Sequence, residues 1–167
     1  MKLVPEAVPF LIPPALRELL TAKVLEYGTG GDVYEHLPGN PVWSILLEDD
    51  SVGGYAWFAE HRGPHSPEGY HLNIAVLPPA QGAGVGTFAL SALESHARSV
   101  GISELFCQVN SNAPSGSYRV RRWLLRSGYS PLRDRDGRYS SCAKLSDDEY
   151  IRDNPLPVYF RKSLVGA

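Results

Sequence analysis

The chain has 167 residues, of which 43% are hydrophobic, and this size and apolar content predict a single globular domain over residues 1–167. The formal net charge of -2 lacks the basic excess of nucleic-acid or anionic-membrane binders, and no apolar run reaches the ~20 residues of a bilayer span, so neither partner is expected. Cys107 and Cys142 form no metal or redox motif and no signal peptide is evident, which predicts a metal-free cytoplasmic protein with reduced thiols.

The first half of the chain predicts one helix followed by strands. Residues 15–28 carry Leu16, Leu19, Leu20 and Val24 at helical spacing and end in a glycine. Residues 42–48 and 52–61 flank the turn Asp-Asp-Ser and predict a hairpin. Residues 70–77 predict a further strand, which leads directly into a glycine-rich stretch.

The second half alternates helices and strands. A helical stripe begins at Val85 and ends at Gly101, a buried strand follows over residues 104–110, and a second helix closes at Gly128. A hairpin and a terminal strand over residues 156–164 complete the chain. This order predicts a mixed α/β (α+β) fold: a mostly antiparallel central sheet flanked by helices, with one strand–Gly loop–helix–strand crossover between parallel neighbours.

Gly82, Gly84 and Gly86 stand at alternate positions where the Val85 helix begins. Glycines at a helix N-terminus let a phosphate reach unpaired backbone N–H groups, although a tight turn without a ligand also uses glycines. A P-loop is excluded because the lysine of GxxxxGK[ST] is missing. The sequence GVGTFA matches a dinucleotide fingerprint literally, but Pro78-Pro79-Ala80-Gln81 intervene between the strand and the first glycine, and no acid ends the next strand. A phosphate-binding loop is therefore the favoured interpretation.

The stretch NIAVLPPAQGAGVGTFAL, residues 73–90, resembles the signature of GNAT-type N-acetyltransferases. Gln81, Gly84 and Gly86 occupy the defining positions of Q/R-x-x-G-x-G/A, with Val76 and Pro78 before them. The resemblance extends from residue 42 to residue 164. It implies a GNAT-like fold and acetyl-CoA-dependent transfer to a primary amine of a small molecule, amino acid or peptide N-terminus, in a ternary complex. A non-catalytic CoA or acyl-CoA sensor or scaffold of the same fold is the alternative.

The resemblance also implies which residues hold acetyl-CoA. The loop amides would bind the pyrophosphate, and the pantetheine arm would pair with strand backbone in a gap between two splayed strands. Asn112 or Ser117 would take the place of an asparagine that commonly faces CoA in the family. The implied cofactor-binding residues are Ile74, Ala75, Val76, Gln81, Gly82, Ala83, Gly84, Val85, Gly86, Thr87, Asn112 and Ser117.

Catalysis requires removal of a proton from the attacking ammonium group. The candidate bases are Glu60 at the end of one strand and Tyr70, His71 and Asn73 on the next. Strand alternation places His71 and Asn73 on one face and Tyr70 on the other. The tyrosine that protonates the leaving thiolate in relatives falls on Leu124, so Tyr118, Ser117 or solvent would replace it.

The second helix also carries residues with open roles. Its apolar face is predicted to hold Val120, Trp123 and Leu124, with Trp123 in the core rather than stacked on a ligand. Its arginines could meet the 3'-phosphate of CoA, but a solvated face is favoured for them; they are Arg119, Arg121, Arg122 and Arg126. The resemblance also allows a homodimer.

Overall fold

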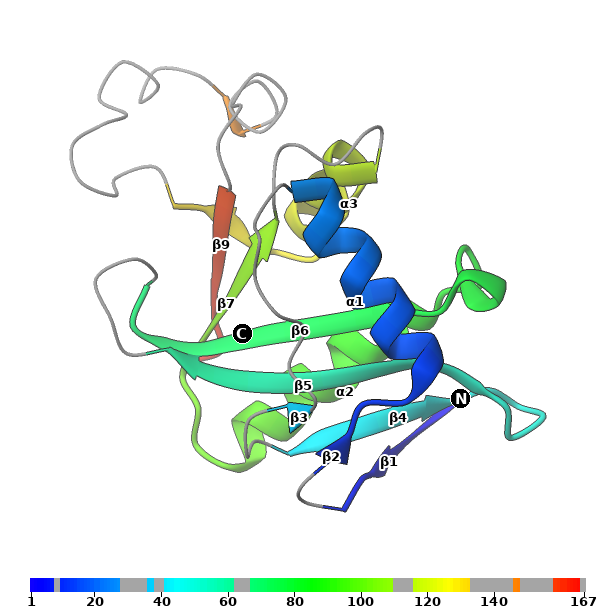
Figure 1. Ribbon diagram of the computed structural model, residues 1–167. Helices are drawn as coiled ribbons and strands as arrows, with labels where there is room; N and C mark the ends of the chain where they lie inside the picture. Colours follow the sequence, from blue (N-terminus) through cyan, green and yellow to red (C-terminus); the bar gives the residue numbers. More distant parts are fainter. Residues whose placement is uncertain are drawn as a thin grey trace.

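The computed structural model describes residues 1–7, 10–27, 36–37, 41–61, 67–109, 116–132, 146–147 and 158–165. Its centre is a seven-stranded sheet with the strand order β1-β4-β5-β6-β7-β9-β8, shown in Figure 1. These strands are β1 (Lys2–Pro5), β4 (Val42–Leu46), β5 (Val52–His61), β6 (Gly69–Val76), β7 (Glu104–Val109), β8 (Ser130–Pro131) and β9 (Val158–Ser163). Only the β6–β7 pair is parallel among these neighbours, so the predicted mixed, mostly antiparallel sheet is confirmed.

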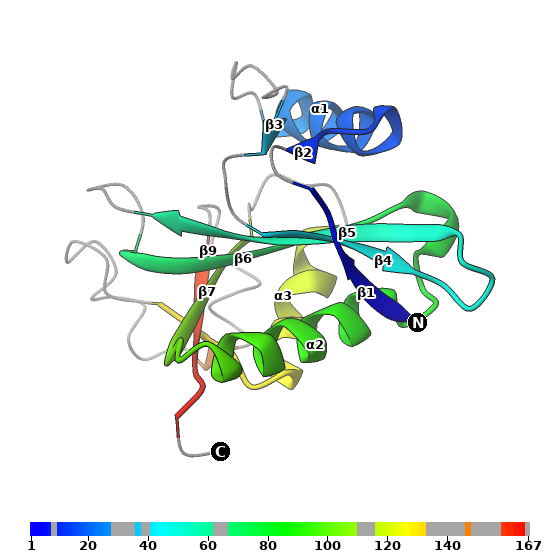
Figure 2. The ribbon, with the colours of Figure 1, turned by 90° about the horizontal axis from the view of Figure 1, so that it is seen from below.

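Helices cover both faces of this sheet (Figure 2). Helix α1 (Pro14–Tyr27) lies on one side with the short strands β2 (Phe10–Leu11) and β3 (His36–Leu37), and we call this side the α1 face. Helices α2 (Val85–Ser99) and α3 (Gly116–Arg126) lie on the opposite side, the α2 face. A single 3₁₀ turn, η1 (Pro78–Ala80), joins β6 to the loop before α2.

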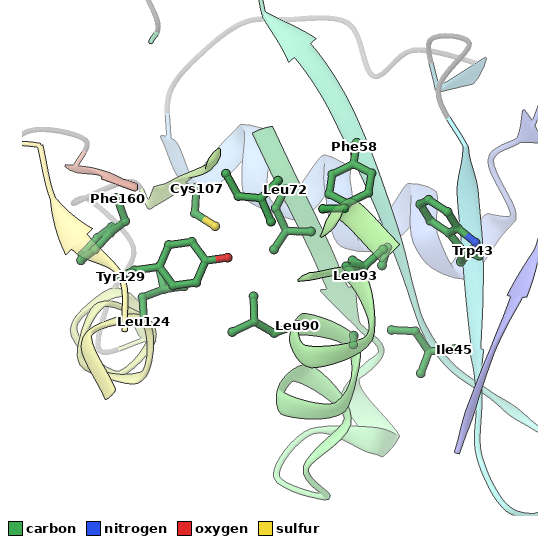
Figure 3. Close-up of a cluster of buried hydrophobic side chains, with 14 of the residues drawn as sticks. Trp43, Ile45, Phe58, Leu72, Leu90, Leu93, Cys107, Leu124, Tyr129 and Phe160 are labelled. Atoms are coloured by element: carbon green, nitrogen blue, oxygen red, sulfur yellow. The ribbon is translucent and has the colours of Figure 1, made fainter. Parts of the chain in front are cut away.

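Strand alternation divides the core between the two faces. On the α2 face, Ile45, Phe58 and Leu72 pack with Leu90 and Leu93 of α2 (Figure 3). The α2 stripe that the sequence predicts is buried, since Val85, Ala89, Leu93 and Ala97 are each at most 1% exposed. Burial of one such leucine contributes about 2 kcal/mol, so this stripe fixes α2 against the sheet.

On the α1 face, Tyr55, Trp57 and Ala75 pack with Phe10 and Leu16. The same strands therefore bury alternate residues under α1 and under α2. The face on which any residue of β5 or β6 projects follows from its position in this alternation, because β5 and β6 pair in one unbroken register.

The parallel strands β6 and β7 pair only at their beginnings. Tyr70 lies opposite Leu105 and His71 lies opposite Phe106, and the described pairing stops there. Strand β6 nevertheless continues to Val76, paired on its other side with β5, and β7 continues to Val109, paired with β9. The two strands separate after His71, as the resemblance implied, and β6 presents an open edge toward β7.

The orientation of α3 differs from the prediction. Val120, expected on the apolar face, is 41% exposed, whereas Arg121, expected on a solvated face, is 2% exposed. The guanidinium of Arg121 reaches the carbonyl oxygen of Val109 at the end of β7, at 3.5 Å. A pattern of polar and apolar residues places arginines on the solvent-facing side of a helix. The carbonyl that accepts a hydrogen bond from Arg121 lies at the end of β7, and the sequence of α3 does not indicate it.

No helix of the described residues is both long and apolar enough to cross a membrane. Within the same residues, no three His, Cys, Asp or Glu side chains gather into a group that could hold a metal ion. The predicted hairpin after Gly128 lies outside the described residues, apart from β8.

Candidate active site

The loop before α2 is built from backbone turns rather than from side chains. Gly82 and Gly84 have φ angles of +83° and +80°, the left-handed region that non-glycine residues rarely adopt. The first helical hydrogen bond runs from the N–H of Phe88 to the carbonyl of Gly84, at 3.0 Å. The N–H groups of residues 84 to 87 precede that bond and have no intrahelical acceptor. With no acidic residue in the first turn, this end of α2 is suited to an anion.

The space around the glycines is open. A Cβ atom added at Gly82 or Gly84 would meet no heavy atom within 4 Å. One added at Gly86 would lie 3.8 Å from Cγ2 of Val76 and 3.9 Å from Cζ2 of Trp123, which is ordinary contact distance. Packing within the described part of the protein therefore does not require glycine at these three positions, and no described side chain blocks the approach to Gly82 and Gly84.

The loop stands at the end of the open β6 edge. Gln81 ties the two together, because its side-chain amide donates to the carbonyl oxygen of Val76 at 3.3 Å. Ile74 and Val76 project toward the α2-face core and Ala75 is buried on the α1 face. Their backbone groups that do not pair with β5 face the gap toward β7. The predicted residues 74–76 and 81–87 are thus brought together along one continuous path.

His71 lies where β6 and β7 begin to separate. It is 4% exposed, and its ring stacks on Phe106 with centroids 5.4 Å apart. Its Nε2 is 2.7 Å from the carbonyl oxygen of Pro67, so Nε2 carries the hydrogen in a neutral ring and Nδ1 is the acceptor. Asn73 projects on the same α1 face and donates from Nδ2 to the carbonyl of His71 at 3.2 Å.

The other two candidate bases lie on the opposite side of the sheet. Glu60 and Tyr70 face each other across β5 and β6. Each stands two residues from an α2-face residue, Phe58 or Leu72, and so projects on the α2 face. Glu60 is exposed and Tyr70 is 38% exposed, and this pair precedes the point of strand separation. The predicted division of Tyr70 from His71 and Asn73 is confirmed, and the candidates do not converge on one point.

Helix α3 carries the remaining candidate residues. Leu124, at the position where the resemblance implies a tyrosine, is 2% exposed and packs in the α2-face core. The ring of Tyr118 packs against that core and lies 5.8 Å from the guanidinium carbon of Arg122. Asn112 lies outside the described residues, as does the side chain of Ser117.

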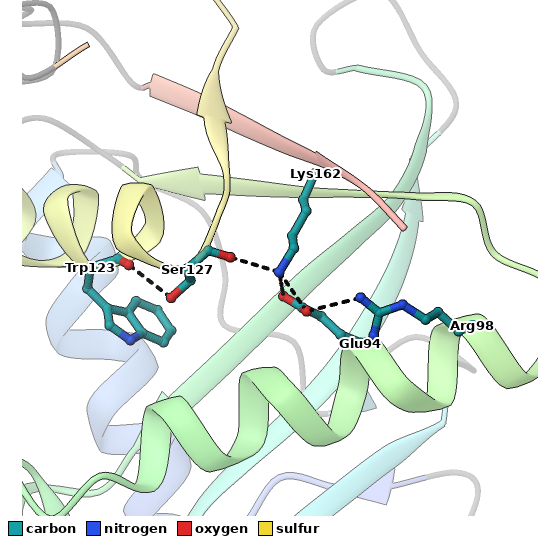
Figure 4. A network of polar contacts seen from close by, with 5 residues as sticks. All are labelled: Glu94, Arg98, Trp123, Ser127 and Lys162. Carbon is teal, nitrogen blue, oxygen red and sulfur yellow. Dashed lines mark hydrogen bonds and ion pairs between the residues drawn. The ribbon is translucent and has the colours of Figure 1, made fainter. Parts of the chain in front are cut away.

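One feature of the α2 face was not predicted. Glu94 of α2 is buried, and Nζ of Lys162 in β9 donates to both of its carboxylate oxygens, at 2.9 and 2.7 Å (Figure 4). The same Nζ donates to the carbonyl oxygen of Ser127, just after α3, at 2.7 Å. These residues are far apart in the sequence, so no local pattern predicts that they form a network. In the sequence, Glu94 is notable only as a charged residue next to the apolar stripe of α2.

Comparison with known proteins agrees with this geometry. The acetyltransferase (GNAT) family model matches residues 14–129. The chain is 32% identical over 74 residues to YycN, an uncharacterized N-acetyltransferase of Bacillus subtilis. That match covers 43% of this chain and 46% of YycN, so the chain matches less than half the length of this curated relative.

Solved structures share the fold over most of the chain. A GNAT-family acetyltransferase from Staphylococcus aureus has a TM-score of 0.60 at 11% identity, covering 98% of each chain. The protein yncA from Salmonella typhimurium, solved with its cofactor acetyl-CoA, has a TM-score of 0.50 at 22% identity, covering 77% of this chain and 67% of yncA. From its family match and its fold, the chain belongs to the GNAT acetyltransferase family.

Proposed function

We propose that the protein is an N-acyltransferase that uses acetyl-CoA to acetylate a primary amine, on a small molecule, an amino acid or a peptide N-terminus, in a ternary complex. The observation that carries the proposal is the open edge of β6, which begins where β6 separates from β7 and leads to the glycine turn of α2. The acetyl-CoA bound to yncA and the activity in the name of YycN support it.

In this proposal the chain holds the cofactor mainly with backbone. The N–H groups of Gly82 and of residues 84–87 would receive the diphosphate, while that of Ala83 donates to the carbonyl of Ala80, and the open β6 edge at residues 74–76 would pair with the pantetheine arm. When bound, acetyl-CoA supplies a thioester carbonyl as the electrophile. An N–H of the β6 edge donates to that carbonyl oxygen and stabilises the negative charge that develops there.

The acceptor amine approaches from the α1 face. Helices α2 and α3 lie on the other face of the sheet, and the candidate side chains next to the open β6 edge, His71 and Asn73, project on the α1 face (Figure 2). We assign His71 as the base, because its bond to the Pro67 carbonyl makes Nδ1 the proton acceptor of the neutral ring. Asn73 orients the amine.

A non-catalytic CoA-binding module remains the second candidate. The buried Leu124 favours it, because no hydroxyl stands at the position from which relatives protonate the leaving thiolate. Binding of CoA without release of thiol to any amine of a broad panel would favour the module over the enzyme.

The proposal is tested by calorimetric titration with CoA and acetyl-CoA. Gly84→Glu places a carboxylate in the turn, and Gly101→Glu is a matched control at the other end of α2, with a φ of +81° and equally open surroundings. Wild type and Gly101→Glu should bind with dissociation constants on the order of micromolar, within the usual range for cosubstrates, and Gly84→Glu should not bind. Equal binding by Gly84→Glu and wild type would reject the loop as the site.

The base is tested by the pH dependence of turnover. His71→Gln should lower kcat by about 100-fold and remove the acidic limb of its pH profile, with CoA affinity unchanged. Tyr70→Phe, one residue away on the opposite face, should keep kcat within a few-fold of wild type. A larger loss of kcat in Tyr70→Phe than in His71→Gln would place the base on the α2 face and reject His71.

A further inference from the structure

Trp123 of α3 was expected in the core, but its indole also reaches the glycine loop. The ring packs against the α2-face core and is only partly buried. Its Nε1 donates to Oγ1 of Thr87, in the first turn of α2, at 3.2 Å. Figure 4 shows the indole on the side of α3 that faces α2.

The direction of this hydrogen bond determines what the Thr87 hydroxyl can do. An indole N–H can only donate, so Oγ1 of Thr87 must accept. A hydroxyl that accepts from one side retains its own hydrogen for a second partner. Thr87 is exposed and follows the open glycines, beside N–H groups that lack an intrahelical acceptor. Its hydrogen is therefore available to the same anion as those N–H groups.

The indole also borders the space beside the loop. Its Cζ2 would be 3.9 Å from a Cβ at Gly86, and Cγ2 of Val76 would be 3.8 Å from the same atom. The end of β6, the first turn of α2 and the edge of the indole thus meet at Gly86. A group bound to the loop amides on this side of α2 would lie near the Thr87 hydroxyl as well.

We propose that Trp123 is a positioning residue that fixes the Thr87 hydroxyl as a hydrogen-bond donor to the diphosphate of CoA. The inference rests on the proposed function and adds to it a specific pair of side chains. The loop binds the anion through backbone N–H groups, and this pair adds one side-chain donor whose position is fixed by Trp123.

The pair is tested by a double-mutant cycle of CoA binding. Thr87→Val removes the donor and should weaken binding about tenfold, whereas Thr87→Ser keeps the hydroxyl and should bind within about twofold of wild type. Trp123→Phe keeps an aromatic ring but removes the part of the indole that carries the N–H, and should weaken binding about fivefold. Because both variants act through one hydroxyl, the double variant should bind no more weakly than Thr87→Val alone.

Two further readouts separate positioning from a merely structural role. Pantetheine has no diphosphate, so its weak binding should be equal in wild type and Trp123→Phe. CoA should also change the tryptophan emission of wild type, because Trp43 and Trp57 are at most 9% exposed and Trp123 is the partly exposed one. This emission measurement leaves Trp123 in place and does not depend on the folding of a variant.

The failures are distinguishable. Losses that multiply in the double variant, or unchanged emission on CoA binding, would overturn the role of Trp123 and leave the proposed function standing. Absence of CoA binding in wild type would overturn the proposed function and this inference with it.

Discussion

The first turn and the middle of α2 are built in opposite ways. The first turn presents glycines and N–H groups without intrahelical acceptors, and residues 81–84 are exposed. In the second half of the same helix, Glu94 is buried, and both of its carboxylate oxygens accept hydrogen bonds from Lys162 (Figure 4). A guanidinium nitrogen of Arg98 lies 3.7 Å from one of these oxygens. The helix satisfies its polar groups where it packs against the protein and leaves them open where we place the cofactor. Mutations should therefore separate stability from binding along one helix.

The largest expected effect is on stability, at the buried ion pair. Lys162→Met leaves the Glu94 carboxylate without its main partner and removes the donor to the carbonyl of Ser127. Breaking a buried pair from one side is costly, so the free energy of unfolding in urea should fall by about 3 kcal/mol. Replacing Glu94 by Gln in the same chain should recover part of the loss, because no carboxylate is then buried alone.

The same variant tests whether the middle of α2 affects CoA binding at its first turn. CoA affinity of folded Lys162→Met, measured by calorimetry, should remain within a few-fold of wild type, since Lys162 contacts α2 only at Glu94 in the described interactions. A loss of affinity as large as that of Gly84→Glu would show that the middle of α2 also controls the loop.

The next effect is a loss of stability at alkaline pH. Burial, together with the nearby negative charge of Glu94, raises the pKa of the Cys107 thiol from 9.0 to about 12. Burial also raises the pKa of Tyr129 in the same cluster, assisted by Cys107 and Glu94. The unfolded chain releases these protons at lower pH than the native state does. The free energy of unfolding is therefore independent of Cys107 below pH 9 and falls as the pH rises from about 9 toward 12.

The contribution of Cys107 is isolated by comparing pH profiles. Ionisation of the Cys107 thiol in the unfolded chain should lower the free energy of unfolding of wild type by about 2 kcal/mol at pH 10.5 relative to pH 8. Cys107→Ala lacks this group but keeps Tyr129, so its urea-unfolding profile should be flatter by that amount. Parallel profiles for the two proteins would mean that the thiol ionises as readily in the native state as in the unfolded chain.

These two regions also differ in how far the sequence predicts them. The glycine loop, the strand before it and the stripe of α2 follow from local patterns: alternate glycines, period-two strands and residues at helical spacing. Faces of β6 follow as well, because alternation places His71 and Asn73 together once the register is unbroken. Helices, strands and turns are determined largely by neighbouring residues, and for the loop, β6 and α2 this local information was enough to predict the structure.

Contacts between distant segments did not follow from such patterns. The Glu94–Lys162 pair joins residues 68 positions apart, and nothing in either segment identifies the other. The rotation of α3, which buries Arg121 and exposes Val120, depends on a carbonyl at the end of β7. The bond from Trp123 to Thr87 likewise depends on how α3 meets α2. For α3, side-chain character alone did not identify the buried face, because the partner of Arg121 lies on a distant segment.

Gly86→Ala should give the smallest change in stability and the sharpest separation of the two regions. Unlike Gly82 and Gly84, Gly86 has no positive φ, and a Cβ there makes only ordinary contacts, at 3.8 and 3.9 Å. Because alanine is the better helix former, the variant should be more stable than wild type by about 0.5 kcal/mol in urea unfolding. Gly82→Ala, strained by its φ of +83°, should instead lose about 1 kcal/mol.

Affinity should move in the opposite direction. The methyl group of Gly86→Ala projects between Val76 and Trp123, into the space that we assign to the cofactor, so CoA binding should weaken by more than about tenfold while stability rises. Calorimetry and urea unfolding on the same preparation measure both quantities. A destabilised variant would mean that glycine is required by the fold. A stabilised variant with unchanged affinity would leave Gly86 without a role in binding, because neither its backbone angle nor its packing accounts for the absent side chain.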